Sequence, residues 1–227
     1  MVCYGGDGTL LEGVHRLCGA PIPVMGINAG HLGFLTSAPS AGLNLIFKEI
    51  AEGRLTTEAR SMIEVTGDYA EQPDTTLALN EFTVQRHGAG MISVETYVDD
   101  QMVATYHGDG VIFSTPTGST AYSLSAGGPV VEPTARNFIV SPICAHSVHA
   151  NAYVLSPERV ITVQTEKNSY KPVLLSVDGG RAFSLRSGDS IEVRRSKFDT
   201  KLVRLSKRSF CEILQKKMLM GGTSNEE

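Results

Sequence analysis

The pattern of apolar residues changes near Thr56, and this change limits the folds that are open to the chain. Before it, Val2 to Tyr4 and Ile22 to Ile27 have the character of buried strands, and a helical pattern follows each of them. From there to about Leu205, short runs of β-branched residues are separated by turn residues. The sequence therefore predicts an α/β region that is followed by a β-rich region.

Turn and cap residues divide these regions further. Three hairpin turns are predicted in the β-rich region, at Asp99-Asp100, Asp178-Gly179-Gly180 and Ser187-Gly188-Asp189. A helix is expected there at Ser119 or Thr120. Near the end, Ser209 and Glu212 fit a capping box for a last helix with the apolar stripe Phe210, Ile213, Leu214 and Met218. In the first region, a helix opening at Ser40 is expected to bury Leu43, Ile46, Phe47 and Ile50 in the core.

A glycine-rich turn, Gly5-Gly6-Asp7-Gly8-Thr9, lies between the first strand and a helix that Thr9 is expected to cap. Glycines let a phosphate approach the backbone closely, and the helix N-terminus supplies free N–H groups. A carboxylate in such a place fits work on a hydroxyl, by accepting its proton or orienting it. The motif alone leaves open that Asp7 is a plain turn residue.

Two other segments carry polar groups in patterns suited to a nucleotide. Asn80 and Glu81 follow the strand 77–79, where an amide and a carboxylate together can bind an adenine edge and ribose hydroxyls; a solvent-exposed polar pair is the commoner reading of such a dipeptide. Gly108-Asp109-Gly110 precedes a strand, and the hydroxyl-rich stretch 115–129 follows it. That stretch predicts a second anion site, with Tyr122 offering a ring face to a ligand.

Bulk properties exclude several classes of protein. The net charge is −4 and the pI is about 5.9, which disfavours a sequence-independent nucleic-acid binder. The four cysteines form no CxxC pair. No apolar stretch is long enough to span a membrane, and the first residues lack the features of a signal peptide. We therefore expect a cytoplasmic protein with reduced thiols. His146 and His149 stand one helical turn apart without a third ligand nearby, so no metal site is expected.

Taken together, these motifs resemble the NAD kinase family across nearly the whole chain. The resemblance rests on the glycine turn at 5–9, residues 28–35, Asn80-Glu81, Asp109-Gly110 and above all the stretch Thr115 to Pro129. It implies a two-domain protein. Residues 1–55 with 206–227 would form a partial Rossmann-like α/β domain, related to phosphofructokinases and diacylglycerol kinases. Residues 56–205 would form a β-sandwich-like NAD-binding domain, and the C-terminal helix would return to the first domain.

The resemblance also implies an activity and a site. The enzyme would phosphorylate the 2′-hydroxyl of the adenosine ribose of NAD, with ATP or polyphosphate as the donor and Mg²⁺ carried by the donor phosphates. The catalytic carboxylate falls on Asp7. Nucleotide contacts fall on Gly8, Leu11, Phe34, Asn80, Glu81, His107, Asp109, Thr117, Thr120, Ala121, Tyr122 and Ser125. The family implies no protein metal ligand, no nucleic-acid or membrane partner, and a homodimer or homotetramer.

The chain departs from the family pattern in three places. Members have a strand and helix before the glycine turn, so we expect these residues alone to be weakly stable or self-associated. Ala145 replaces a proline, and residues 148–152 lack the usual arginine-proline. His107 stands where members carry arginine or glycine, which leaves the donor open. Two rival functions remain: a lipid or sugar kinase built on the same first domain, and a truncated NADP-binding protein without turnover.

Overall fold

The computed structural model describes residues 1–29, 33–36, 38–39, 43–67, 69, 76–147, 150–204 and 209–220. The chain divides into two compact units. The first unit comprises residues 1–13, 23–58 and 201–227, and the second unit comprises residues 14–22 and 59–200. None of the described helices is long and apolar enough to cross a lipid bilayer.

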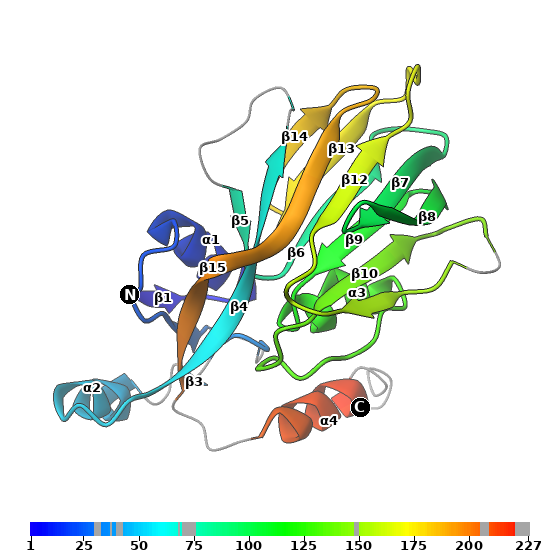
Figure 1. Cartoon of the computed structure of the whole chain (residues 1–227). Coiled ribbons are helices and arrows are strands. Elements are labelled where there is room, and N and C mark those ends of the chain that lie inside the picture. Colours follow the sequence, from blue (N-terminus) through cyan, green and yellow to red (C-terminus); the bar gives the residue numbers. More distant parts are fainter. Residues whose placement is uncertain are drawn as a thin grey trace. The chain divides into compact units, whose positions relative to one another are not determined.

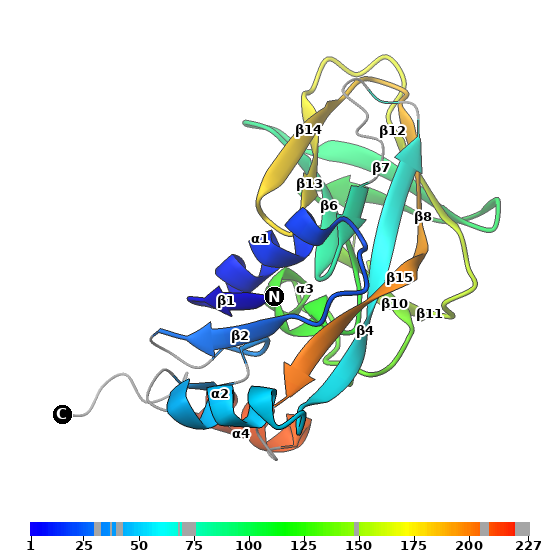
Figure 2. The same cartoon turned by 90° about the vertical axis from the view of Figure 1, so that its left-hand side faces the viewer.

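The first unit is built on a parallel sheet with the strand order β1-β2-β3. Its strands are β1 (Val2–Tyr4), β2 (Met25–Asn28) and β3 (Ala38–Pro39). Its helices are α2 (Leu43–Ala51), α4 (Phe210–Met220) and the first part of α1 (Asp7–Leu17), whose residues 14–17 belong to the second unit. Helices lie on both faces of this sheet (Figure 2). Leu10 of α1 packs closely against Gly26, whereas Ile46 of α2 packs with Met25 and Ile27.

Several expectations for the first unit need correction. The second strand begins at Met25 rather than Ile22, and α1 begins at Asp7 rather than after a Thr9 cap. Phe47 and Ile50 are 57% and 38% exposed, so the prediction that both lie in the core is wrong. Helical spacing shows only that these side chains share a face with Ile46. It does not reveal how much of that face is covered by the rest of the protein.

The second unit is a β-sandwich of two six-stranded sheets (Figure 1). One sheet has the order β5 (Thr76–Ala78), β4 (Thr56–Gly67), β15 (Ser190–Arg204), β12 (Ile161–Thr165), β7 (Ile92–Val98) and β8 (Gln101–Gly108). The other has the order β11 (Tyr153–Leu155), β10 (Phe138–Ile143), β9 (Gly110–Ser114), β6 (Glu81–Arg86), β13 (Val173–Val177) and β14 (Arg181–Leu185).

Alternating apolar residues from both sheets meet in one core. Phe82 and Phe113 of one sheet are fully buried with Val94 and Val193 of the other. Their neighbours in sequence point to the opposite face, as the two-residue period of a strand requires. The β-rich character expected from the sequence is therefore confirmed.

Two of the three predicted hairpins are confirmed, and one helix is shorter than expected. The turns at Asp99-Asp100, with φ of 47° and 65°, and at Asp178, with φ of 46°, connect the antiparallel pairs β7–β8 and β13–β14. Gly188 is also left-handed, with φ of 81°, but its turn joins β14 to β15, strands of different sheets, so the predicted hairpin there is wrong. The capping box before α4 is confirmed, because Ser209 N–H donates to Glu212 Oε2 at 2.7 Å and Glu212 N–H to Ser209 Oγ at 3.3 Å. The Met218 side chain lies outside the described residues.

The helix predicted at Ser119 or Thr120 is a 3₁₀ turn, Gly118–Thr120, followed by the four-residue α3 (Tyr122–Ser125). Side-chain hydroxyls bond the local backbone here, with Ser119 Oγ donating to Pro116 O at 2.7 Å, and these bonds compete with a regular helix. So short a helix adds little dipole, and the expected second anion site does not rest on a helix N-terminus.

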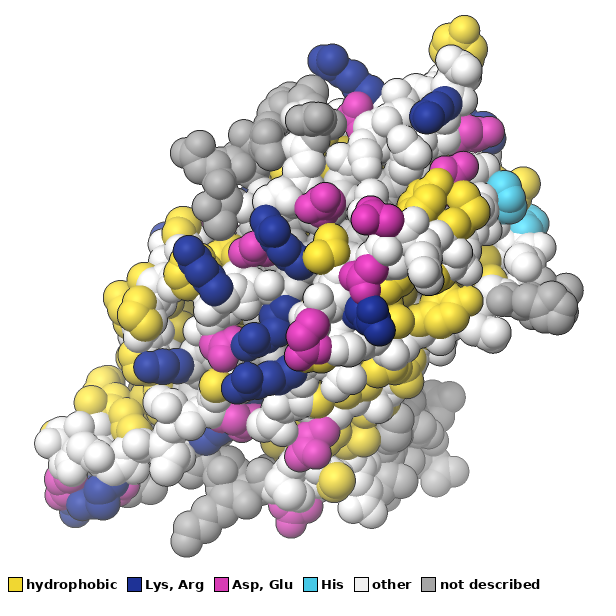
Figure 3. Space-filling view, in the orientation of Figure 1, with side chains coloured by type: hydrophobic (Ala, Val, Ile, Leu, Met, Phe, Trp, Pro, Cys, Tyr) yellow, Lys and Arg dark blue, Asp and Glu magenta, His cyan; other side chains and the backbone are white. Residues whose placement is uncertain are grey.

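Charged side chains over β4 and β15 are interspersed by sign (Figure 3). Arg194 Nε lies 3.0 Å from Glu64 Oε1, and Arg195 Nη2 lies 2.8 Å from Asp199 Oδ1. At the ends of the same strands, Arg204 Nε lies 2.9 Å from Glu58 Oε2. These three arginines are therefore paired with acidic side chains, which weakens their attraction for a polyanion.

Candidate active site

Asp7 is the first residue of α1, and its carboxylate fixes the segment 33–36. Oδ2 accepts the N–H of Phe34 at 2.8 Å, and Oδ1 accepts those of Leu35 and Thr36 at 3.1 Å and 3.3 Å. Glycine is required at position 33, because a Cβ there would lie 1.8 Å from Asp7 Oδ1. The sequence motif 28–35 and Asp7 thus form one structure, although residues 30–32 lie outside the described part of the chain.

The glycine turn beside Asp7 leaves open space. A Cβ added at Gly6 or Gly8 would meet no atom of the described protein within 4 Å, so packing does not explain the glycines there. Backbone N–H groups at the start of a helix attract anions. Leu11 and Phe34, two predicted nucleotide contacts, are half-buried in this unit. The Phe34 ring lies 4.1 Å from Lys217 Nζ of α4 in a cation–π contact.

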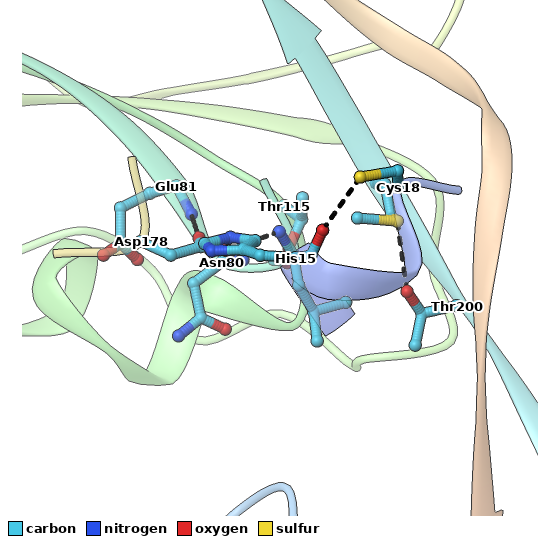
Figure 4. Close-up of polar contacts among 9 residues, drawn as sticks. His15, Cys18, Asn80, Glu81, Thr115, Asp178 and Thr200 are labelled. Atoms are coloured by element: carbon cyan, nitrogen blue, oxygen red, sulfur yellow. Dashed lines mark hydrogen bonds and ion pairs between the residues drawn. The ribbon is translucent and has the colours of Figure 1, made fainter. Parts of the chain in front are cut away.

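In the second unit, the backbone at Asn80 and Glu81 is held by a carboxylate that is distant in sequence. Asp178 Oδ1 accepts the N–H of Asn80 at 2.8 Å and of Glu81 at 2.9 Å, and Oδ2 accepts that of Leu79 at 2.9 Å. His15 Nε2 lies 2.8 Å from the same Oδ2. Figure 4 shows the Asn80 side-chain amide turned away from Asp178, so that it stays available to a ligand.

The segment after β9 locks onto the same backbone. Thr115 N–H donates to Asn80 O at 2.9 Å, and Thr115 Oγ1 donates to Leu79 O at 2.6 Å. Gly118 N–H donates to Thr115 Oγ1 at 3.1 Å, and a Cβ on Gly118 would lie 2.2 Å from Asn80 O. The two motifs, 34 residues or more apart in sequence, therefore form one rigid corner.

Glu81 is the first residue of β6 and is only 6% exposed. Among the described residues, its Oε2 has no hydrogen-bond partner. Burial and, to a smaller extent, the negative charge of Asp178 together raise the pKa of Glu81 to about 8. The side chain is therefore largely protonated at pH 7 and offers a ligand one O–H donor.

This pKa predicts a pH-dependent stability. The unfolded glutamate ionises near its ordinary value of 4.5, whereas the folded one ionises near 8. Between those pH values the unfolded state binds fewer protons, so the free energy of unfolding falls as the pH rises, and it levels off above 8. Glu81→Gln removes this loss, and we expect it to gain on the order of a few kcal/mol over the wild type between pH 5 and 8.

Denaturant unfolding of both proteins at intervals from pH 5 to 8 measures this difference. Glu132→Gln is the matched control, since Glu132 is exposed and the same substitution there should follow the wild type. A constant difference between Glu81→Gln and wild type over this range would mean that Glu81 is ionised in the folded protein.

The remaining predicted contacts lie around Tyr122. Its side chain is 39% exposed, and burial, followed by the nearby Cys144, Asp109 and Glu81, raises its pKa. The fold therefore brings Tyr122, Asp109 and Glu81 into one electrostatic neighbourhood. Thr117 is buried and accepts a hydrogen bond from Arg60 Nη1 at 3.3 Å, Thr120 and Ala121 are half-buried, and Ser125 is exposed.

Asp109 and His107 lie at the end of β8. Arg86 Nε lies 2.5 Å from Asp109 Oδ1, and this hydrogen bond lowers the pKa of Asp109, so its carboxylate is ionised and already paired. His107 is exposed, and its Nδ1 lies 2.9 Å from Ser93 Oγ. The described residues contain no group of three acidic, histidine or cysteine side chains arranged to hold a metal ion, and His149 lies outside them.

Three structural residues escaped the sequence reasoning. Asp178 was predicted only as part of a hairpin turn, and nothing in the sequence singled out His15 or Arg60. Arg60 is in fact 1% exposed and lies behind Thr117. Each acts on a segment at least 57 positions away, and a single sequence carries no signal of such a contact.

Comparison with known proteins matches both parts of the chain to one family. The model of the ATP-NAD kinase N-terminal domain matches residues 1–55, and the model of the C-terminal domain matches residues 79–205. The NAD kinase of Natranaerobius thermophilus is 37% identical over 97% of this chain and 78% of its own length. That of Symbiobacterium thermophilum is 40% identical over 96% of this chain and 77% of its own.

Solved structures give the same result. Yeast NADH kinase, in complex with NADH, superposes with a TM-score of 0.87 at 28% identity, covering 100% of this chain and 67% of the other. An NAD kinase from Archaeoglobus fulgidus, in complex with ATP, superposes with a TM-score of 0.81 at 35% identity, covering 95% and 81%. By its sequence matches and by its two-domain fold, the chain belongs to the NAD kinase family.

Proposed function

We propose that Asp7 and the corner at Asn80 carry the activity of the family in this chain. NAD kinases phosphorylate the 2′-hydroxyl of the adenosine ribose of NAD and produce NADP, and this chain is a phosphotransferase of that kind. The observation that carries the assignment is the rigid backbone at 79–81. Asp178 and Thr115 hold it from two sides, which presents the Asn80 amide and the Glu81 carboxyl in fixed positions.

Asp7 is proposed to orient and deprotonate the acceptor hydroxyl. The hydroxyl oxygen forms a bond to the terminal phosphorus of the donor, the bond from that phosphorus to the leaving phosphate oxygen breaks, and the proton passes to Asp7. The carboxylate is held by three backbone N–H groups, so it needs little rearrangement before it acts. Gly6 and Gly8 leave the neighbouring backbone open to phosphate oxygens.

The donor is proposed to be ATP, the nucleotide bound in the structure of the Archaeoglobus fulgidus enzyme. Because His107 stands where members of the family carry arginine or glycine, polyphosphate remains a second candidate donor. Measuring NADP formation with ATP and with polyphosphate in the same assay would test this. Mg²⁺ is proposed to enter as part of the donor, bound to its phosphates. There it neutralises charge on the transferred group.

The NAD contacts are proposed to extend from Asn80 and Glu81 to the segment around Tyr122. An amide and a protonated carboxyl together provide donors and acceptors for an adenine edge and ribose hydroxyls. Tyr122 offers a partly exposed ring beside them. Further contacts are assigned to Asp109, Thr117, Thr120, Ala121 and Ser125, with Gly8, Leu11 and Phe34 in the first unit.

Removal of the Asn80 amide tests the site directly. Asn80→Ala should weaken NAD binding by about 1–3 kcal/mol, because it removes hydrogen bonds to a buried ligand. Titration calorimetry with NAD measures the effect, and Glu81→Ala should act in the same direction. Asn44→Ala, at an exposed asparagine on α2, is the control for the substitution itself. Unchanged NAD affinity in both Asn80→Ala and Glu81→Ala would rule out this site.

The finer architecture is also a proposal. We assign residues 1–55 and 206–227 to a Rossmann-like kinase domain related to phosphofructokinases and diacylglycerol kinases, and residues 56–205 to the NAD-binding domain. The parallel order of β1, β2 and β3 and the contact of Lys217 with Phe34 support the first domain and the return of α4 to it.

A homodimer or homotetramer is proposed, and light scattering after gel filtration would identify it.

A further inference from the structure

The Asp178 carboxylate is enclosed more completely than a hairpin turn requires. Its side chain is 0% exposed, and it accepts three backbone hydrogen bonds from Leu79, Asn80 and Glu81. His15 Nε2 completes the set at 2.8 Å, itself with a side chain only 7% exposed. In return, Asp178 N–H donates to Glu81 O at 3.0 Å. The contacts come from two distant segments of the chain, residues 79–81 and His15, and converge on one carboxylate (Figure 4).

Asp99 shows what an aspartate in such a turn does otherwise. It has φ of 47°, against 46° for Asp178, and it also accepts a backbone N–H, from Val160 at 3.0 Å, beside a basic partner, Arg159. Its side chain is nevertheless 40% exposed. Turn geometry therefore does not explain the burial of Asp178. Taking a carboxylate out of water costs several kcal/mol, and only a full set of donors offsets that cost.

We infer that Asp178, locked in place by His15, is a positioning residue for NAD, acting through the backbone of 79–81. This inference rests on the proposed function, in which Asn80 and Glu81 contact NAD. By binding three consecutive N–H groups, the carboxylate fixes where β6 begins and in which direction the Asn80 amide points. Asp178 itself makes no contact with the substrate. A ligand then meets groups that are already oriented, so it does not have to order the segment on binding.

The two carboxylate oxygens have separate partners, which makes the inference testable by conservative changes. Oδ1 serves Asn80 and Glu81, whereas Oδ2 serves Leu79 and His15. Asp178→Asn keeps the size and can keep Oδ1, but its amide group then faces the N–H of Leu79, donor against donor. His15→Phe keeps a ring and removes only the imidazole partner of Oδ2, leaving the N–H of Leu79 in place. Both changes should loosen the segment 79–81 without touching a ligand group.

Steady-state kinetics with NAD and Mg-ATP separate positioning from general stability. We expect Asp178→Asn to raise the KM for NAD at least tenfold and His15→Phe to raise it severalfold, while the KM for Mg-ATP stays within twofold in both. Because both changes act through one network, the double variant should be no worse than Asp178→Asn alone. Asp99→Asn, the same change in the matching turn, should leave both KM values within twofold, whatever its effect on melting temperature.

Two results would overturn the inference. One is an unchanged KM for NAD in His15→Phe and Asp178→Asn, while Asn80→Ala still weakens NAD binding; the proposed NAD site would then stand without the positioning role. The other is an equal rise of both KM values, or a loss of active enzyme with both KM values unchanged, since a structural defect alone produces those. If Asp178→Asn does not fold, His15→Phe decides. An unchanged NAD affinity in Asn80→Ala itself would instead refute the proposed function.

Discussion

Asp7→Asn should lower kcat by about 10²-fold or more while NAD affinity stays close to that of the wild type. An amide of the same size cannot take the proton from the 2′-hydroxyl, and general acid–base groups typically contribute about 10²- to 10⁴-fold. A fall in kcat and kcat/KM together marks a group that acts in the transition state rather than in ground-state binding. A coupled assay for NADP at saturating Mg-ATP measures both constants, and calorimetry measures NAD binding.

The structure adds a complication, because Asp7 also fixes the segment 33–36. In Asp7→Asn the amide nitrogen would replace Oδ2 and face the N–H of Phe34, so some of the lost activity could arise from a displaced loop. Thr36→Val is the matched control. Thr36 Oγ1 accepts the N–H of Gly33 at 3.1 Å, and valine removes that bond at nearly constant shape without touching the carboxylate.

We expect Thr36→Val to lose less than tenfold in kcat. If it loses as much as Asp7→Asn, the effect at Asp7 belongs to the loop, and its chemical role is refuted. Activity of Asp7→Asn within threefold of the wild type would refute both roles at once.

The sequence predicted most of what local chemistry determines. Left-handed residues at Asp99, Asp178 and Gly188 followed from the turn motifs, and the Ser209 cap followed from its spacing to Glu212. Strand alternation placed the β-sandwich, because a two-residue period is a local property. The motif from Thr115 to Pro129 identified the family, although it gave no reason why these residues fold against Asn80.

What the sequence did not predict depends on contacts between distant segments. Asp7 lies 27 to 29 positions from the amides that it binds, and Asp178 lies 97 to 99 positions from its own. The exposure of Phe47 and the burial of Arg60 depend on how much of each segment is covered by other parts of the protein. Composition and the spacing of apolar residues along the chain do not reveal that coverage. The candidate residues were therefore named without the two carboxylate networks that position them.

The same long-range packing makes Gly118→Ala a small change from which we expect a large effect on NAD binding. The new Cβ would lie 2.2 Å from Asn80 O and 2.5 Å from its carbonyl carbon, distances that real Cβ atoms do not show, so the backbone must move. Overpacking of this kind typically costs about 1–3 kcal/mol of stability. Here the atoms displaced are those of Asn80 itself, and NAD affinity should fall about 100-fold or more, at or above the upper end of the range expected for Asn80→Ala.

Gly180→Ala is the matched control for this prediction. A Cβ there would come no closer than 4.0 Å, to Val177 O, in a turn of the same unit, and we expect stability and NAD affinity close to those of the wild type. Thermal melting and NAD calorimetry on the two variants make the comparison. The collision in Gly118→Ala acts on the protein rather than on the ligand, so its melting temperature should fall even without NAD. Loss of NAD binding at an unchanged melting temperature would instead mean that Gly118 touches NAD directly, and the rigid corner described above would not be the cause.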